Sequence, residues 1–65
     1  MITNGTRVLY RFYNTPERRF YGEYQRGVVV GVDLDEAGVK HYTVIREGAP
    51  PIALQRKEIK RIIRS

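Results

Sequence analysis

The stretch YQRGVVVGVDL, residues 24–34, decides the fold of this 65-residue chain. Its centre is rich in valine, a residue typical of β-strands. The valines occupy both alternating positions, so either both faces of the strand are covered or the strand bends. A bulge at Gly27 or Gly31 would let the strand turn the corner of a small barrel. We therefore expect one bent strand from about Tyr24 to Leu34.

The residues before this stretch predict a strand followed by a long loop. Residues 7–13, RVLYRFY, alternate in character, which is the pattern of a half-buried strand. One side of that strand carries Val8, Tyr10 and Phe12, and the other carries Arg7 and Arg11. Residues 14–22 begin with the turn formers Asn14, Thr15 and Pro16 and end at Gly22, so they are expected to form a long loop.

Two more strands are expected after residue 34. Acidic residues and a glycine in DLDEAG, residues 33–38, indicate a hairpin turn into a third strand at residues 39–45. The segment REGAPP ends that strand. Pro50 and Pro51 are expected in the connection, because neither can donate a backbone hydrogen bond to a ladder. A short fourth strand is predicted at residues 52–55.

The C-terminal tail, QRKEIKRIIRS, places isoleucines at helical spacing and basic residues opposite them. The isoleucines are Ile59, Ile62 and Ile63, and the basic residues are Lys57, Lys60, Arg61 and Arg64. The tail predicts a short helix, or a 3-10 turn leading into a last strand. The chain is thus expected to be one all-β domain, residues 1–65, whose four to five short antiparallel strands close into a small barrel without exposed edges.

The composition limits what such a domain can do. There is no cysteine and only one histidine, so neither a disulfide nor a metal site is expected, and no cofactor is implied. A domain of this size has a thin core, so packing or homo-oligomerisation must stabilise it. The N-terminus MITNGTRV lacks signal-peptide features and the longest apolar run is GVVVGV. We therefore expect a cytoplasmic protein that has no membrane partner.

The formal net charge of +5 is unevenly placed along the chain. Residues 1–32 carry a net +3, residues 33–48 a net −2 and residues 49–65 a net +4. If the two basic ends meet in the fold, they present one positive face that attracts phosphate. The alternative is a charge balance that merely keeps the domain soluble.

In its order of strands and turns the chain resembles a Tudor-type domain of the SH3-like barrel superfamily. The resemblance is carried by NGTRVLYRF, YGEYQRGVVVGVD, YTVIREG and IALQRKEIKRI, and covers nearly the whole chain as a profile of apolar spacing. It implies a cage of aromatic rings for a methylated cation, drawn from Phe12 or Tyr13, Phe20, Tyr21, Tyr24 and Tyr42. A thin core competes for these rings, and we expect Tyr10, Phe12 and Tyr42 to be core residues. Glu47 stands where such cages have an aspartate or asparagine.

The C-terminal third has a second resemblance. GAPPIALQRKEIKRI is similar to the end of the CsrA/RsmE messenger-RNA-binding regulators, in which an alanine-proline turn precedes a short strand. This similarity implies an RNA-contacting role for Arg56. The N-terminal half lacks the opening strand and glycine-glutamate turn of that family.

Residues 11–26 hold five aromatic rings and four arginines, a mixture that suits nucleic acid. Bases stack on flat rings while guanidinium groups neutralise the phosphates between them, and such binding weakens steeply with salt. The candidate nucleic-acid-binding residues are Arg11, Tyr13, Arg18, Arg19, Phe20, Tyr21, Arg26, Lys57, Lys60 and Arg61. The same rings and arginines would also suit a protein partner or an assembly domain. Arginine stems also lie across rings simply to cover them.

Nothing in the chain predicts an enzyme. His41 has no serine, cysteine or second histidine near it in the sequence to form a nucleophile and base pair, and we expect it on a strand surface. Asp33, Asp35 and Glu36 lack the ligand spacing of a calcium loop, so a solvated hairpin turn is the better interpretation. We therefore expect a non-enzymatic binding module whose partner is nucleic acid or protein.

Overall fold

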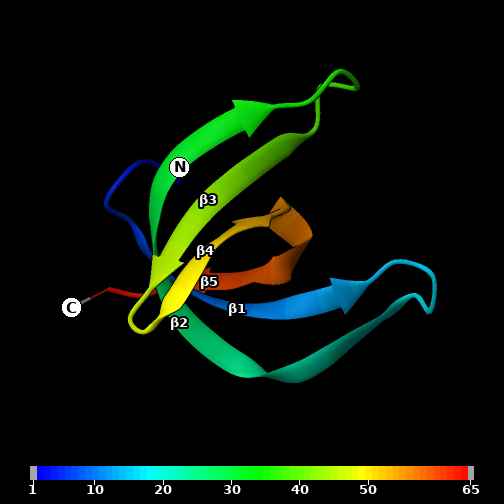
Figure 1. Cartoon of the computed structure of the whole chain (residues 1–65), viewed down its shortest axis with the longest axis horizontal. Coiled ribbons are helices and arrows are strands. Elements are labelled where there is room, and N and C mark those ends of the chain that lie inside the picture. The colour runs from blue at the N-terminus through cyan, green and yellow to red at the C-terminus, as the bar shows by residue number, and fades with distance from the viewer. Residues whose placement is uncertain (1, 65) are drawn as a thin grey trace.

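The structure is a computed structural model that describes residues 2–64. Within these residues the chain forms antiparallel strands and one short 3-10 helix, η1 (Figure 1). The elements are β1 (Arg7–Asn14), β2 (Arg19–Leu34), β3 (Lys40–Arg46), β4 (Ala49–Leu54), η1 (Arg56–Glu58) and β5 (Ile59–Ile62). The all-β prediction is therefore confirmed, with five strands. No helix of the described residues has the length and apolar character needed to cross a bilayer.

The strands form a single sheet in the order β4-β3-β2-β1-β5. Strands β4 and β5 are its two edges, and no backbone pairing joins them among residues 2–64, so the sheet is not closed into the expected barrel. The sheet nevertheless curls around one core to which all five strands contribute. The core residues are Val8, Tyr10, Val29, Tyr42, Val44, Leu54 and Ile59. The two edge strands thus contribute Leu54 and Ile59 to one core without sharing a ladder, and η1 connects them in the chain.

The long strand β2 bends, as the glycine and valine pattern predicted. Its register against β3 shifts between Val29 and Gly31, which places a bulge at the expected glycine. On the two sides of this shift, Val29 is buried in the core and Val30 is exposed. In Figure 1, β2 sweeps from the β1–β2 hairpin to the β2–β3 hairpin, and both hairpins project from the same side.

The long loop expected at residues 14–22 is wrong. The strands pair up to Tyr13 with Phe20 and Asn14 with Arg19, so only residues 15–18 form the turn. The register of this hairpin is not continuous. Tyr10 pairs with Gln25, but Phe12 pairs with Tyr21, so β2 has two more residues than β1 between these two pairs. Gly22 lies in this irregular part of β2 with a φ of 76°, so it serves a bulge rather than a loop.

The expected position of the two prolines is also wrong. Strand β4 begins at Ala49 and includes Pro50 and Pro51, which leaves Glu47 and Gly48 as the connection. Two features allow prolines in this strand. The outer side of the edge strand β4 has no neighbouring strand that needs its backbone donors, and the pairing of β4 with β3 is irregular at the prolines. The fourth strand therefore starts three residues earlier than the sequence indicated, and it ends at Leu54.

The second alternative for the C-terminal tail is confirmed. A 3-10 helix leads into β5, which pairs antiparallel with β1. The two basic ends of the chain therefore lie side by side in the sheet, which was the condition for a single positive face.

Candidate functional site

One face of the sheet points away from the core and carries most of the candidate residues. In β1 the side chains of Val8 and Tyr10 are buried, so the intervening positions face outward. Leu9 lies opposite Arg26 of β2 and opposite Arg61 of β5, which places all three on one side. We call this side the outer face; it comprises Arg7, Leu9, Arg11, Tyr13, Phe20, Tyr24, Arg26, Val28 and Arg61, together with Lys57 and Lys60 where η1 and β5 meet the hairpin.

The aromatic rings of the β1–β2 hairpin form two separate groups. Tyr13 and Phe20 pair edge to face on the outer face, with ring centroids 4.9 Å apart. Phe12 and Tyr21 stack on the opposite face at 5.8 Å, and Phe12 also meets the core residue Tyr10. Phe20 is 42% exposed, and Tyr21 and Tyr24 are each 49% exposed. The prediction that Tyr10 and Tyr42 are core residues is confirmed. Phe12 is half-buried and packs against the core, whereas Phe20, Tyr21 and Tyr24 are exposed on the surface.

Two cations on the outer face are held against these rings. The Nε atom of Arg11 donates a hydrogen bond of 2.8 Å to the carbonyl oxygen of Gly22, and its guanidinium carbon lies 5.5 Å from the centroid of the Tyr24 ring. The ammonium of Lys57 lies 4.3 Å from the centroid of the Tyr13 ring. Contacts of this kind stabilise an exposed cation by about 0.5–1 kcal/mol. Arg11 and Lys57 therefore have preferred positions before any ligand arrives.

A pocket of about 240 Å³ lies where the hairpin meets η1 and β5, and we call it the hairpin slot. Its lining residues are Arg11, Phe20, Tyr24, Lys57, Glu58, Ile59 and Lys60. The carboxylate of Glu58 is already engaged, because Oε2 accepts from the Tyr13 backbone at 3.1 Å and Oε1 accepts from the Gln55 backbone at 3.0 Å. The slot thus combines two exposed rings with three cations, and its one carboxylate is occupied by backbone donors.

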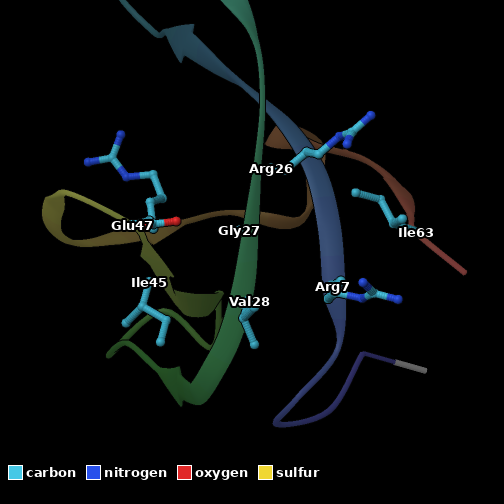
Figure 2. Close-up of a pocket in the computed structure, with 8 residues that line it drawn as sticks. Arg7, Arg26, Gly27, Val28, Ile45, Glu47 and Ile63 are labelled. Carbon is cyan, nitrogen blue, oxygen red and sulfur yellow. The ribbon is translucent and has the colours of Figure 1, made fainter. Parts of the chain in front are cut away.

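A second pocket of about 230 Å³ lies further along the outer face (Figure 2). Figure 2 shows Arg7, Arg26 and Ile63 on one side of β2 and Ile45 and Glu47 on the other. Arg46 also lines this pocket, but its terminal nitrogens donate to Gln25 Oε1 and to the Pro50 carbonyl, and its Nε has no partner in the described residues. Arg7 and Arg26 are therefore the exposed cations of this pocket.

Few of the basic side chains are paired with carboxylates. The chain has twelve lysines and arginines, and within residues 2–64 only Arg19 forms an ion pair, with Glu17 at the hairpin turn. The cations of the outer face have no carboxylate oxygen within 4.0 Å in this part of the chain. Their positive potential is consequently reduced by solvent and salt and, at longer range, by carboxylates such as Glu47 and Glu58.

The structure brings most of the predicted site residues together. Arg11, Tyr13, Phe20 and Arg26 lie on the outer face, and so do the C-terminal cations Lys57, Lys60 and Arg61, through the slot or through the pairing of β5. Tyr21 lies on the opposite face of the hairpin, and Arg18 and Arg19 lie at its turn, where Arg18 has a φ of 54°. Sequence reasoning missed Arg7, although the alternation of Arg7 with Arg11 in the first strand was a signal for it.

The remaining polar candidates have structural roles. Asp35 organises the β2–β3 turn: Oδ1 accepts from the backbones of Ala37 and Val39, and Oδ2 lies 2.8 Å from His41 Nε2. The His41 side chain and these backbone donors hold the pKa of Asp35 below its usual value. Arg56 donates to the carbonyl oxygen of Ile59 and lines a different hollow, with Tyr42. Among the described residues no three histidine, aspartate or glutamate side chains gather as a metal site.

Comparisons with protein-family models, with curated proteins and with solved structures find no match to this chain.

Proposed function

We propose that this domain is a non-enzymatic binding module that holds nucleic acid on its outer face, through phosphate contacts and ring stacking. The observation that carries the proposal is the gathering of unpaired cations beside exposed rings on one side of the sheet. These cations are Arg7, Arg11, Arg26, Lys57, Lys60 and Arg61, and the exposed rings are Phe20 and Tyr24.

Electrostatics favours a polyanion over a neutral partner. Each lysine or arginine that neutralises a phosphate releases condensed counterions, so the binding constant falls as salt rises. The outer face combines cations from β1, β2 and β5 with those of η1, and the acidic residues of the β2–β3 turn lie on a different hairpin. No arrangement of side chains on this face reads base edges, so we expect phosphate-driven binding with little base specificity.

We also propose that the fold is of the SH3-like, Tudor-like type, with its barrel left open between β4 and β5. Three features support this: the long β2 bends at a bulge, β1 pairs with both β2 and β5, and a 3-10 helix precedes the last strand. The rings named for a methylated-cation cage do not converge: Phe12 and Tyr21 stack on one face of the hairpin, Tyr13 and Phe20 pair on the other, and Tyr42 is buried. The same geometry favours the nucleic-acid function over the cage.

The test is retention of labelled DNA and RNA, single-stranded and duplex, at low and at raised salt. We expect retention at low salt. Arg26→Ala and Arg61→Ala should each make the negative slope of the logarithm of the binding constant against the logarithm of salt concentration less steep by about 1. Lys40→Ala is the matched control, because it removes the same charge at the start of β3, away from the outer face. The proposal fails if no nucleic acid is retained at low ionic strength, or if Lys40→Ala weakens binding as much as Arg26→Ala does.

A second candidate function, contact with a protein or with another copy of the chain, is favoured by a different observation. Apolar side chains are exposed along β2, β3 and the turn between them: Val30, Val32, Leu34, Val39 and Ile45. Exposed apolar groups of this kind mark interaction surfaces when they are contiguous. Light scattering over a concentration series tests self-association. If the measured mass stays that of a monomer at every concentration, and Leu34→Glu does not change that mass, this candidate loses its support.

A further inference from the structure

The hairpin slot is built to hold a flat group next to an anion. We propose that it takes an unpaired base together with its phosphate, so that the ligand of the outer face is a single strand rather than a duplex. This inference rests on the proposed function and makes it more specific.

The rings of the slot are available for stacking. Phe20 and Tyr24 both line the pocket. The two residues are 42% and 49% exposed, which is more than large aromatic residues usually are in a folded domain. A base inside a duplex has both faces covered by its neighbours, so a ring can stack only on a base that is already unpaired or has been flipped out. Exposed rings inside a concave site therefore add affinity for a single strand and little for a duplex.

The cations lie where the phosphate of a stacked nucleotide needs them. Arg11 uses its Nε to bond the Gly22 carbonyl, which leaves its terminal nitrogens free to bind an anion. Lys57 sits beside the Tyr13 ring, and Lys60 lines the same pocket. A nucleotide offers a flat base and an anion a few bonds apart, which matches this alternation of rings and cations.

The slot is pre-organised on its η1 side as well. Glu58 ties η1 to β1 through the Tyr13 backbone and caps η1 through the Gln55 backbone. Ile59 is 3% exposed and anchors the following strand in the core. A ligand therefore does not have to order this region, which lowers the entropic cost of binding.

The experiment compares three ligands of equal length, roughly 10 nucleotides, which is within the site sizes of single-strand-binding folds. They are oligothymidylate, an abasic deoxyribose-phosphate strand that has the same charge but no bases, and a duplex. Oligouridylate is added as an RNA arm. We expect the protein to bind oligothymidylate about tenfold more tightly than the abasic strand, which corresponds to one stacked base. Because this comparison uses the unmodified protein, it does not depend on any variant folding.

The variants locate the effect in the slot. Tyr24→Ala and Phe20→Leu are each expected to abolish the tenfold preference, which is measured for each variant as the ratio of its binding constants for oligothymidylate and for the abasic strand. Tyr21→Ala is the matched control, because Tyr21 is as exposed as Tyr24 but lies on the other face of the same hairpin, against Phe12. Circular dichroism and thermal unfolding identify any variant that has lost its fold.

The outcomes separate this inference from the proposed function. Equal binding of oligothymidylate and the abasic strand, or a preference for the duplex at the same salt, would overturn the inference while phosphate binding stands. Loss of base preference in Tyr21→Ala but not in Tyr24→Ala would overturn it as well. If none of the ligands is retained at low ionic strength, the proposed function itself fails.

Discussion

At Gly27 the backbone of β2 passes so close to β3 that no side chain fits between them. A Cβ atom there would overlap the Val44 side chain in the core and lie 3.0 Å from the carbonyl oxygen of Ile45. Gly31 differs, because its Cβ would meet only Thr43, at an ordinary distance of 3.8 Å. The two glycines of the deciding stretch therefore have separate roles: Gly27 allows close packing, and Gly31 lies at the bulge.

Gly27→Ala is therefore expected to destabilise the domain. Overpacking of a filled core costs about 1–3 kcal/mol, and here the contact includes a backbone atom that cannot rotate away. Denaturant unfolding measures the effect, with Gly31→Ala as the control. Equal stability of Gly27→Ala and the unmodified protein would show that β2 and β3 are further apart than described.

The Asp35 carboxylate gives the β2–β3 turn a dependence on pH. The bond from His41, followed by the backbone bond from Val39, lowers the pKa of Asp35 below its usual value of 3.8. A carboxyl whose pKa is depressed by folding stabilises the folded state above its unfolded pKa, and that contribution is lost as the pH falls through the folded pKa. The contribution is therefore intact at neutral pH and disappears in acid.

A carboxyl titration followed by NMR checks this relation. Asp35 is expected to titrate below 3.8, and His41→Ala is expected to move its midpoint upward, because the first cause of the depression has been removed. The unmodified protein, titrated under the same conditions, is the reference. An Asp35 midpoint that His41→Ala leaves unchanged would contradict the hydrogen bond.

The strands divide into those that the sequence predicted and those that it did not, for reasons visible in their pairing. The first and third strands follow from alternation, because each has one face in the core. The hairpin at residues 14–22 and the first residues of the fourth strand, which include Pro50, were missed. Turn formers and prolines mark local preferences, whereas a bulge and an edge position are properties of the assembled sheet.

The candidate site was predicted in composition rather than in arrangement. Arginines and rings within residues 11–26 could be read from the sequence, but their division between two faces depends on the register shift between Tyr10 and Phe12. That shift places Tyr24 on the outer face beside Arg11 and leaves Tyr21 opposite it. The contribution of η1 to the slot depends on tertiary contacts that no local pattern encodes.

The 3-10 helix η1 depends on Glu58 for its position. That half-buried carboxylate accepts one backbone bond from β1 and one from the residue before η1. Glu58→Ala is expected to lower the free energy of unfolding by about 2 kcal/mol, since hydrogen bonds to charged groups are among the stronger ones. It should also loosen the slot and so weaken single-strand binding.

Both effects of Glu58→Ala are measurable against Glu23→Ala, which removes an exposed carboxylate from the same hairpin region. Denaturant unfolding gives the stability, and titration with oligothymidylate gives the affinity. If Glu58→Ala unfolds at the same denaturant concentration as Glu23→Ala, η1 is held by something other than this carboxylate.

The molecule as a whole separates its charges by pairing its two ends. Because β5 lies beside β1, the basic C-terminal residues join the basic first half on the outer face. The acidic residues 33–36 occupy the β2–β3 hairpin, which is a separate projection of the sheet (Figure 1). The cations of the outer face form no ion pairs with carboxylates in residues 2–64, so they repel one another, and an anionic ligand would reduce this repulsion.

The most direct test of this account is a backbone NMR titration of the domain with oligothymidylate at low ionic strength. The largest chemical-shift changes are expected on the amides around the hairpin slot, at Arg11, Phe20, Tyr24, Lys57 and Lys60, and they should diminish as salt is added. The amides of the β2–β3 hairpin, around Gly38, should stay unchanged. Changes centred on that hairpin, or no changes at all at low salt, would contradict the account.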